Sequence, residues 1–152
     1  MQLTRYSDYS LRVLIYLAVD PDRLATIDQI ARSYGVSRAH LMKVVHQLGL
    51  RGYVETVRGR GGGLRLARPP EKIRIGEVVR ATEENLALVE CMDPVTSECV
   101  IEPACGLRSV LCEALAAFLA VLDRYTLADL VARRRRPLVA LLQPSSSREV
   151  RS

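Results

Sequence analysis

The sequence predicts a mainly α-helical protein with one small β-hairpin, organised as a winged helix-turn-helix domain followed by a long dimerisation helix. Three observations predict this class. Two capped helices separated by a glycine lie within residues 26–50, a glycine-rich hairpin follows within 53–67, and an apolar helical pattern covers residues 107–125. A chain of 152 residues is long enough for one small core with an extension.

The first predicted helix covers residues 9–18. Ser7-Asp8 can cap its start, because short polar side chains accept hydrogen bonds from the free N–H groups of a first turn. The run Asp20-Pro21-Asp22 ends it, since proline cannot continue the helical hydrogen-bond ladder. The pattern therefore places one helix ahead of the helix-turn-helix.

Two helices joined by a glycine turn follow, over residues 27–34 and 38–50. Thr26 and Gln29 have the spacing of a capping box, which marks the start of the first of them. Gly35 ends that helix, because glycine readily adopts the left-handed backbone of a helix terminus. This order of helix, turn and helix is the core of a DNA-binding motif.

The second helix of this pair has the composition of a helix that reads DNA. Major-groove contacts need short polar or basic side chains near the helix N-terminus, and this chain offers Ser37, Arg38, His40 and Lys43 there. The opposite face is apolar and is expected to pack on the preceding helix through Leu41, Val44, Val45 and Leu48. We predict that the four polar residues contact DNA, with Ser37 also capping the helix.

A glycine-rich hairpin with arginines at its tip completes the unit. Residues 53–58 and 64–67 have strand character, and the segment 59–63 must turn between them. Arg58 and Arg60 lie among the glycines, so that backbone and cations can both approach a phosphate chain. A nucleotide-binding loop is excluded, because no Gly-Lys-Ser/Thr follows and the next element is a strand. With a net charge of +5, the pattern predicts double-stranded DNA as the partner.

These patterns divide the chain into four parts. Residues 1–70 form the winged helix-turn-helix DNA-binding region, and residues 71–104 hold a linker helix and a polar loop that carries cysteines. Residues 105–142 hold the dimerisation helix and a C-terminal helical segment, and residues 143–152 are expected to be a flexible tail. The apolar stripe over 107–125 is wider than one small domain needs, which predicts a homodimer.

Four cysteines lie in the second half of the chain. Cys91, Cys99 and Cys105 are in or at the edge of the polar loop, without the close Cys-x2–4-Cys pairs of zinc sites. Such wide spacing suits an iron–sulfur cluster, although ordinary or redox-active thiols fit it equally well. We expect Cys105 to begin a helix, where the helix dipole favours the thiolate. Cys112 would then lie about 10 Å further along the axis, and we expect a buried apolar role for it.

Short motifs spread over residues 1–142 carry a family resemblance. They are Met1-Gln-Leu-Thr4 with Asp8-Tyr9, Tyr34-Gly-Val-Ser37, Gly52-Tyr-Val54, Val57-Arg-Gly59, Gly62-Gly63, Ile73-Arg-Ile-Gly-Glu-Val-Val79, Ile101-Glu-Pro-Ala-Cys105 and Tyr125-Thr-Leu-Ala-Asp-Leu-Val131. In combination they resemble the IscR/NsrR family of winged-helix regulators, and within it the NsrR-type nitric-oxide-sensing repressors.

The resemblance implies a cofactor, a partner and a signal. It implies a homodimer and a [4Fe-4S] cluster on Cys91, Cys99 and Cys105, with a carboxylate from the partner's first helix as fourth ligand, a position at which Asp8 stands. It implies that nitric oxide attacks the cluster and releases the repressor from DNA. IscR-type members place a histidine three residues after the third cysteine, where this chain has Arg108. The gap between Cys91 and Cys99 is longer than in some members, so [2Fe-2S] stays as the alternative cofactor.

Other classes of protein stay open at this stage. The main alternative is a zinc- or thiol-redox-dependent DNA-binding regulator without an iron–sulfur cluster, and a more distant one is a cluster-trafficking or redox protein. An enzyme is not predicted, because no nucleophile–base pair has a supporting context. The N-terminus has no signal pattern and the apolar runs are short, which predicts a cytoplasmic protein that makes no membrane contact.

Overall fold

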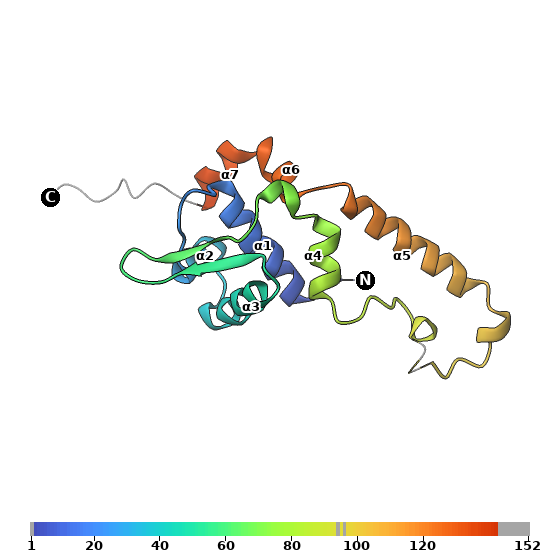
Figure 1. The fold of residues 1–152 in the computed structure, drawn as a ribbon. Coiled ribbons are helices and arrows are strands. Elements are labelled where there is room, and N and C mark those ends of the chain that lie inside the picture. The colour runs from blue at the N-terminus through green and yellow to red at the C-terminus, as the bar shows by residue number, and fades with distance from the viewer. Residues whose placement is uncertain (1, 94, 96, 143–152) are drawn as a thin grey trace.

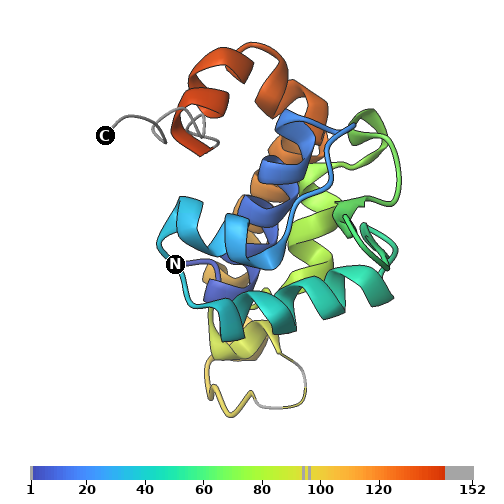
Figure 2. The ribbon, with the colours of Figure 1, turned by 90° about the vertical axis from the view of Figure 1, so that its left-hand side faces the viewer.

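Helix α1 (Arg5–Val19) is the central element of the computed structural model, which describes residues 2–93, 95 and 97–142. It contacts helices α3, α4, α6 and α7 and strand β2 (Figures 1 and 2). Its N-cap is Thr4, whose hydroxyl accepts a hydrogen bond from the Ser7 N–H at 3.2 Å. The predicted cap at Ser7-Asp8 is therefore wrong, because the Ser7 hydroxyl is buried and donates to Thr82 instead, at 2.8 Å.

The helix-turn-helix has the predicted boundaries, with α2 over Ile27–Tyr34 and α3 over Arg38–Leu50. The capping box at Thr26 and Gln29 is formed, with N–O distances of 2.8 and 3.2 Å. Gly35 adopts the left-handed backbone at φ 63° that ends α2. Ser37 is the N-cap residue of α3, but its side chain makes no capping hydrogen bond.

The wing is an antiparallel hairpin of β1 (Val54–Val57) and β2 (Gly63–Leu66), one residue away from the predicted strand limits. Ala25 joins its edge by exchanging two backbone hydrogen bonds with Leu64, at 3.0 and 2.7 Å. Gly63 makes this approach possible, since a Cβ atom there would lie 2.9 Å from the Ala25 carbonyl oxygen. The hairpin is thereby fixed to the segment that leads into α2.

A short 3-10 turn over Pro70–Lys72 leads into α4 (Ile75–Thr82), which packs against α1. Helix α4 also meets the end of α5 closely, because a Cβ atom on Gly76 would lie 2.1 Å from Asp123 Oδ1. The Ile75 N–H donates to the Tyr125 carbonyl at 3.0 Å, and the Leu127 N–H donates to the Ile73 carbonyl at 2.8 Å. These contacts anchor the C-terminal end of α5 to the winged domain.

Helix α5 (Leu107–Asp123) projects from the body of the molecule, and the cysteine loop runs from the end of α4 to its far end (Figure 1). The loop holds two 3-10 turns, Glu90–Met92 and Glu102–Ala104. Cys105 ends the second turn and Gly106 is the N-cap of α5, so the expectation that Cys105 begins the helix is wrong. Residues 102–104 form a separate 3-10 turn that ends at Cys105, so the α-helix begins two residues later, at Leu107.

Helices α6 (Leu127–Ala132) and α7 (Arg135–Leu142) return to the winged domain, where α7 contacts α1 and α2 (Figure 2). A capping box of Thr126 and Asp129 starts α6, and Arg135 Nε donates to the Val19 carbonyl at 2.9 Å. The predicted tail over residues 143–152 lies outside the described residues. Among the helices of the described ranges, none is both long and apolar enough to cross a bilayer.

Candidate nucleic-acid interface and cysteine loop

Helix α3 has the two faces that its sequence predicts. The four apolar residues on its inner face are buried at 7% exposure or less: Leu41, Val44, Val45 and Leu48. The four residues predicted to contact DNA are all exposed: Ser37, Arg38, His40 and Lys43. The start of α3 therefore presents a polar and basic surface that a major groove can accept.

The tip of the wing is a second exposed basic surface. Arg58 and Arg60 are exposed, and the neighbouring Gly59 and Gly61 have positive φ angles of 100° and 75° that form the turn. Arg65 differs from them, since it forms an ion pair with Glu55 across the hairpin. Arg58 and Arg60 are thus exposed cations at the tip, whereas Arg65 is paired with a carboxylate.

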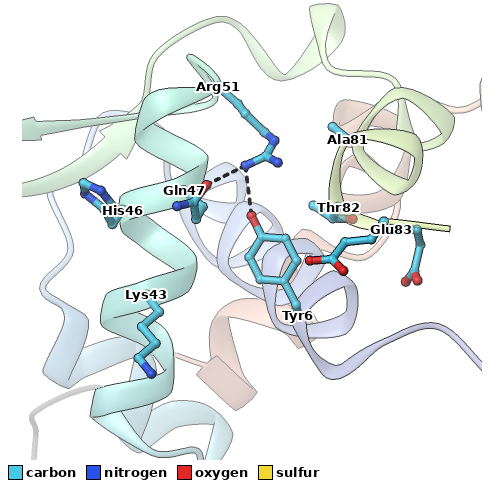
Figure 3. Close-up of a pocket in the computed structure, with 9 residues that line it drawn as sticks. Tyr6, Lys43, His46, Gln47, Arg51, Ala81, Thr82 and Glu83 are labelled. Atoms are coloured by element: carbon cyan, nitrogen blue, oxygen red, sulfur yellow. Dashed lines mark hydrogen bonds between the residues drawn. The ribbon is translucent and has the colours of Figure 1, made fainter.

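A hollow of about 530 Å³ lies between α3, the start of α1 and the end of α4 (Figure 3). Arg51 Nη1 closes one side of it by donating to Tyr6 Oη at 3.3 Å and to Gln47 Oε1 at 2.9 Å. Lys43 lies on the α3 wall, and Glu83 lies on the opposite wall. This link between the end of α3 and α1 is not evident in the sequence, because Tyr6 and Arg51 are 45 residues apart.

Asp8 lies in the first turn of α1, where it forms a two-point ion pair with Arg12. Arg12 Nε donates to Asp8 Oδ1 at 2.9 Å, and Arg12 Nη2 lies 2.9 Å from Oδ2. The Asp8 side chain is 44% exposed, so an approaching ligand can reach it. Both of its oxygens pair with Arg12, and Thr4 is the residue that caps α1. Asp8 therefore does not have the capping role that the sequence suggests.

Aromatic rings surround Arg12 and connect it to α3. Its guanidinium carbon lies 5.8 Å from the ring centroids of both Tyr9 and Tyr34. Burial raises the pKa of Tyr34 to about 12, so its hydroxyl stays protonated and donates to the Arg12 carbonyl at 3.0 Å. The Tyr9 ring in turn lies 6.4 Å from the ring of His40 on α3. Asp8 is thus linked through side chains to the predicted DNA-contacting surface.

Three of the four cysteines belong to the loop between α4 and α5. All four thiols are free, with Cys91 buried and Cys99 and Cys105 half-buried. Burial raises the pKa of the Cys91 thiol, and the nearby Cys99 and Cys105 thiols raise it further. Within the described ranges, no three histidine, cysteine or acidic side chains lie close enough together to hold a single metal ion. The chemistry of the donor set nevertheless fits a thiolate-bound iron–sulfur cluster.

Two residues of α5, Cys112 and Arg108, lie close to the loop in the sequence. Cys112 lies on α5 and is exposed, so the expectation of a buried apolar role is wrong for the single chain, whose own residues leave this face of α5 uncovered. Arg108 Nη1 donates to Glu102 Oε1 at 3.0 Å, while Glu102 Oε2 accepts from Ser97 Oγ at 2.8 Å. Arg108 therefore braces the loop between Cys99 and Cys105.

The helix-turn-helix, the basic wing and the exposed face of α3 define a winged-helix DNA-binding regulator of transcription. Residues 3–133 match the model of the Rrf2 family, described as iron-dependent transcriptional regulator, and the chain belongs to this family. The predicted fold class is confirmed.

Individual relatives agree with the family assignment. The chain is 61% identical over 132 residues to the HTH-type transcriptional regulator NsrR of Bacillus subtilis (strain 168). The aligned region covers 86% of this chain and 90% of that protein. Two solved structures are similar in fold. T. potens IscR has a TM-score of 0.71 and 25% identity, with 88% of each chain covered. CymR, the global cysteine regulator of B. subtilis, has a TM-score of 0.72 and 26% identity, with 88% of this chain and 98% of that chain covered.

These comparisons settle two predictions. The similarity to NsrR-type regulators is confirmed at high identity over most of the chain. The prediction that the chain is not an enzyme is confirmed as well, because its relatives are named transcriptional regulators.

Proposed function

We propose that the chain is a homodimeric repressor that binds double-stranded operator DNA and responds to nitric oxide through a [4Fe-4S] cluster. The observation that carries the proposal is that the one loop between α4 and α5 contains Cys91, Cys99 and Cys105, in a chain that is 61% identical to an NsrR regulator. The loop connects α4 directly to α5, so a group bound there affects both elements.

The three thiolates would supply three ligands of the cluster, and Asp8 of the partner subunit would supply the fourth. When bound, the cluster supplies iron that reacts with nitric oxide. A carboxylate is a harder and weaker ligand for such iron than a thiolate, so this position exchanges most readily. Both oxygens of Asp8 pair with Arg12, so ligation of a cluster by Asp8 would compete with this ion pair.

A change at Asp8 reaches α3 through side-chain contacts. Arg12 packs on the rings of Tyr9 and Tyr34, and Tyr9 contacts His40. When Asp8 leaves or regains Arg12, the position of the guanidinium changes, and the rings that contact it respond. This path supports the proposal that the state of the cluster sets the position of the DNA-contacting surface.

The two basic surfaces have different proposed roles on DNA. Near the start of α3, Ser37, Arg38, His40 and Lys43 contact base edges and nearby backbone in the major groove. At the tip of the wing, Arg58 and Arg60 contact phosphates, which strengthens binding to every sequence. A dimer would place two copies of α3 about one helical turn of DNA apart, roughly 34 Å.

The uncovered face of α5 supports the dimer. Leu111, Leu115 and Phe118 are half-buried on their own chain. A second apolar face is exposed, and its members repeat at helical spacing: Leu107, Val110, Ala114 and Val121. A second copy of the chain is the proposed occupant of this face, since two such stripes bury each other in a two-fold interface.

The proposal is tested with anaerobically purified protein. We expect broad visible absorption from thiolate-bound iron, an iron content that matches it, and binding to a promoter duplex that nitric oxide abolishes. Metal analysis is run on the same sample. A colourless protein that contains zinc, or one whose DNA binding follows thiol oxidation alone, would establish the alternative regulator without an iron–sulfur cluster.

A further inference from the structure

Arg38, the first residue of α3, forms an ion pair with Asp28 of α2. Arg38 Nε lies 2.8 Å from Asp28 Oδ1, and the two side chains are 61% and 57% exposed. Exposed ion pairs contribute little to folding stability. Asp28 also has Arg32 one turn further along its own helix, the usual position for a helical ion pair, yet it pairs with Arg38. The ion pair therefore joins α2 to the first residue of α3.

The pair leaves the outer end of the Arg38 guanidinium free to bind. Because the guanidinium is planar and rigid, an ion pair at Nε limits the positions that the whole group can take. Two parallel N–H donors, Nη1 and Nη2, then form a fork at the outer end. A fork of this kind matches the O6 and N7 acceptors of guanine in the major groove. Asp28 thus restricts Arg38 without using the atoms that would read a base.

The carboxylate has a second effect, because it is itself negatively charged. A phosphate that approached Arg38 would be repelled by Asp28, whereas a guanine edge carries no net charge. The wing offers the opposite arrangement, with Arg58 and Arg60 exposed at a glycine-rich tip. Cations for general DNA affinity and a cation paired for selective contact thus occupy separate places in the fold.

We propose that Asp28 is a positioning residue that determines sequence specificity, by orienting Arg38 toward a base edge and by keeping it from serving as a general phosphate contact. This inference rests on the proposed function, in which the start of α3 lies in the major groove. It concerns discrimination between DNA sequences and not the total strength of binding.

The test compares binding to two duplexes under anaerobic conditions. One is selected by the wild-type protein from a randomised duplex pool, and the other is its scrambled version. For Asp28→Asn, we expect tighter binding to the scrambled duplex and a preference for the selected duplex that falls roughly two- to fivefold, the range that exposed ion pairs support. The salt dependence on scrambled DNA should steepen by up to about one unit, because Arg38 becomes available to a phosphate.

Three further variants separate the explanations. Asp28→Glu keeps the charge and should restore most of the preference. Glu71→Gln removes the same charge from the exposed turn before α4, and it should leave the preference unchanged. Circular dichroism of each variant confirms that the domain is folded. A loss of preference in Glu71→Gln equal to that in Asp28→Asn would overturn the inference, because net charge alone would then explain the effect.

The role of Arg38 is tested in parallel, so that the two claims fail separately. Arg38→Ala should lose preference, and adding Asp28→Asn to it should lower the preference no further. If Arg38→Ala lowers the preference but Asp28→Asn does not, Asp28 has no positioning role and the proposed function stands. If Arg38→Ala leaves the preference intact, the proposed base contact of Arg38 itself is wrong.

Discussion

Asp8 and Arg12 are joined at two points, one turn apart on α1, with both N–O distances at 2.9 Å. The carboxylate that the family resemblance assigns to the cluster therefore has a competing partner within its own chain. In the proposed site, a carboxylate subject to this competition would exchange more easily than a thiolate, because carboxylate oxygen binds such iron less strongly. The ion pair also links ligation to the tyrosines that surround Arg12.

The first prediction concerns the ligands. Asp8→Ala should still assemble a cluster on three thiolates, but should lose it several-fold faster in air or chelator and bind DNA less well. Cys91→Ala, Cys99→Ala and Cys105→Ala should each abolish visible absorption. Cys112→Ala is the matched control, since this exposed thiol on α5 should not affect the absorption or the response to nitric oxide. The visible spectrum before exposure to air tests the four cysteine variants, and the decay of the absorption after exposure compares Asp8→Ala with the wild type.

The reverse result would replace the ligand set. If Asp8→Ala kept the cluster as long as the wild type did while Cys112→Ala was colourless, the site would consist of four cysteines. The approach of Cys112 would then require α5 to rearrange at its start, because Cys112 lies within the helix and Cys105 lies before it.

The second prediction concerns the wing. Arg60→Ala should weaken binding to selected and scrambled duplexes by the same factor, and it should reduce the salt slope by about one unit, as expected for one lost phosphate contact. Titrations at several salt concentrations measure both. Arg65→Ala is a useful comparison, since Arg65 is already paired with Glu55 and should change the slope less. A change in base preference for Arg60→Ala would instead make it a base contact.

The helix boundaries show which parts of the fold local sequence can predict. Helices α2 and α3 begin and end as predicted, because the caps and the glycine turn between them are local signals. The start of α1 was placed too late, because the Ser7 hydroxyl is bonded to Thr82, 75 residues away. When a distant hydrogen bond engages one candidate side chain, neighbouring residues alone do not show which residue caps the helix.

In the candidate site, too, local features follow from the sequence, whereas contacts between helices do not. The exposed residues at the start of α3 were predicted from residue type and helical position, and the structure leaves them on the surface. The contacts of Asp28 with Arg38 and of Tyr6 with Arg51 were missed, since each joins two different helices. Cys112 was misplaced because helical periodicity does not show which apolar face of α5 the chain itself covers.

The third prediction concerns assembly. Val121→Asp places a charge on the exposed apolar face of α5, where the side chain is 43% accessible in the single chain. We expect the fold to persist and the dimer to dissociate, because a charge buried without a partner in an interface is costly. Sedimentation velocity measures the mass, and circular dichroism measures the helix content. Val121 is a cleaner test than Phe118, which is half-buried on its own chain.

A control on the same helix makes this result specific. Ala116→Asp adds the same charge at another exposed position of α5, away from the proposed apolar face, and it should leave the dimer intact. A Val121→Asp protein that sediments as a dimer would show that the two copies meet elsewhere. DNA binding should fall with dimer dissociation, since a single copy contacts only one half-site.

The fourth prediction concerns the contact between Thr4 and Glu83, which joins the start of α1 to the end of α4. Glu83 Oε1 accepts hydrogen bonds from the Thr4 N–H at 2.8 Å and from the Thr4 hydroxyl at 3.0 Å. Burial acts to raise the pKa of Glu83, but the polar groups of Ser7 and Thr4 beside the carboxylate outweigh it and lower the pKa below the ordinary 4.5. The folded state therefore holds the ionised form more strongly than the unfolded state does.

The sign of the pH effect follows from this lowered pKa. The stabilisation is fully present above about pH 4.5, the ordinary value, and is lost as the pH falls through the lower pKa of the folded protein. Glu83→Gln should therefore lower the midpoint of thermal unfolding at neutral pH, by the equivalent of about 0.5–1 kcal/mol for partly exposed hydrogen bonds. The difference from the wild type should shrink as the pH falls below 4.5. Glu84→Gln, which removes the same charge from the exposed neighbour, should shift the midpoint far less. Equal effects of the two variants at every pH would show that the Thr4 contact does not stabilise the fold.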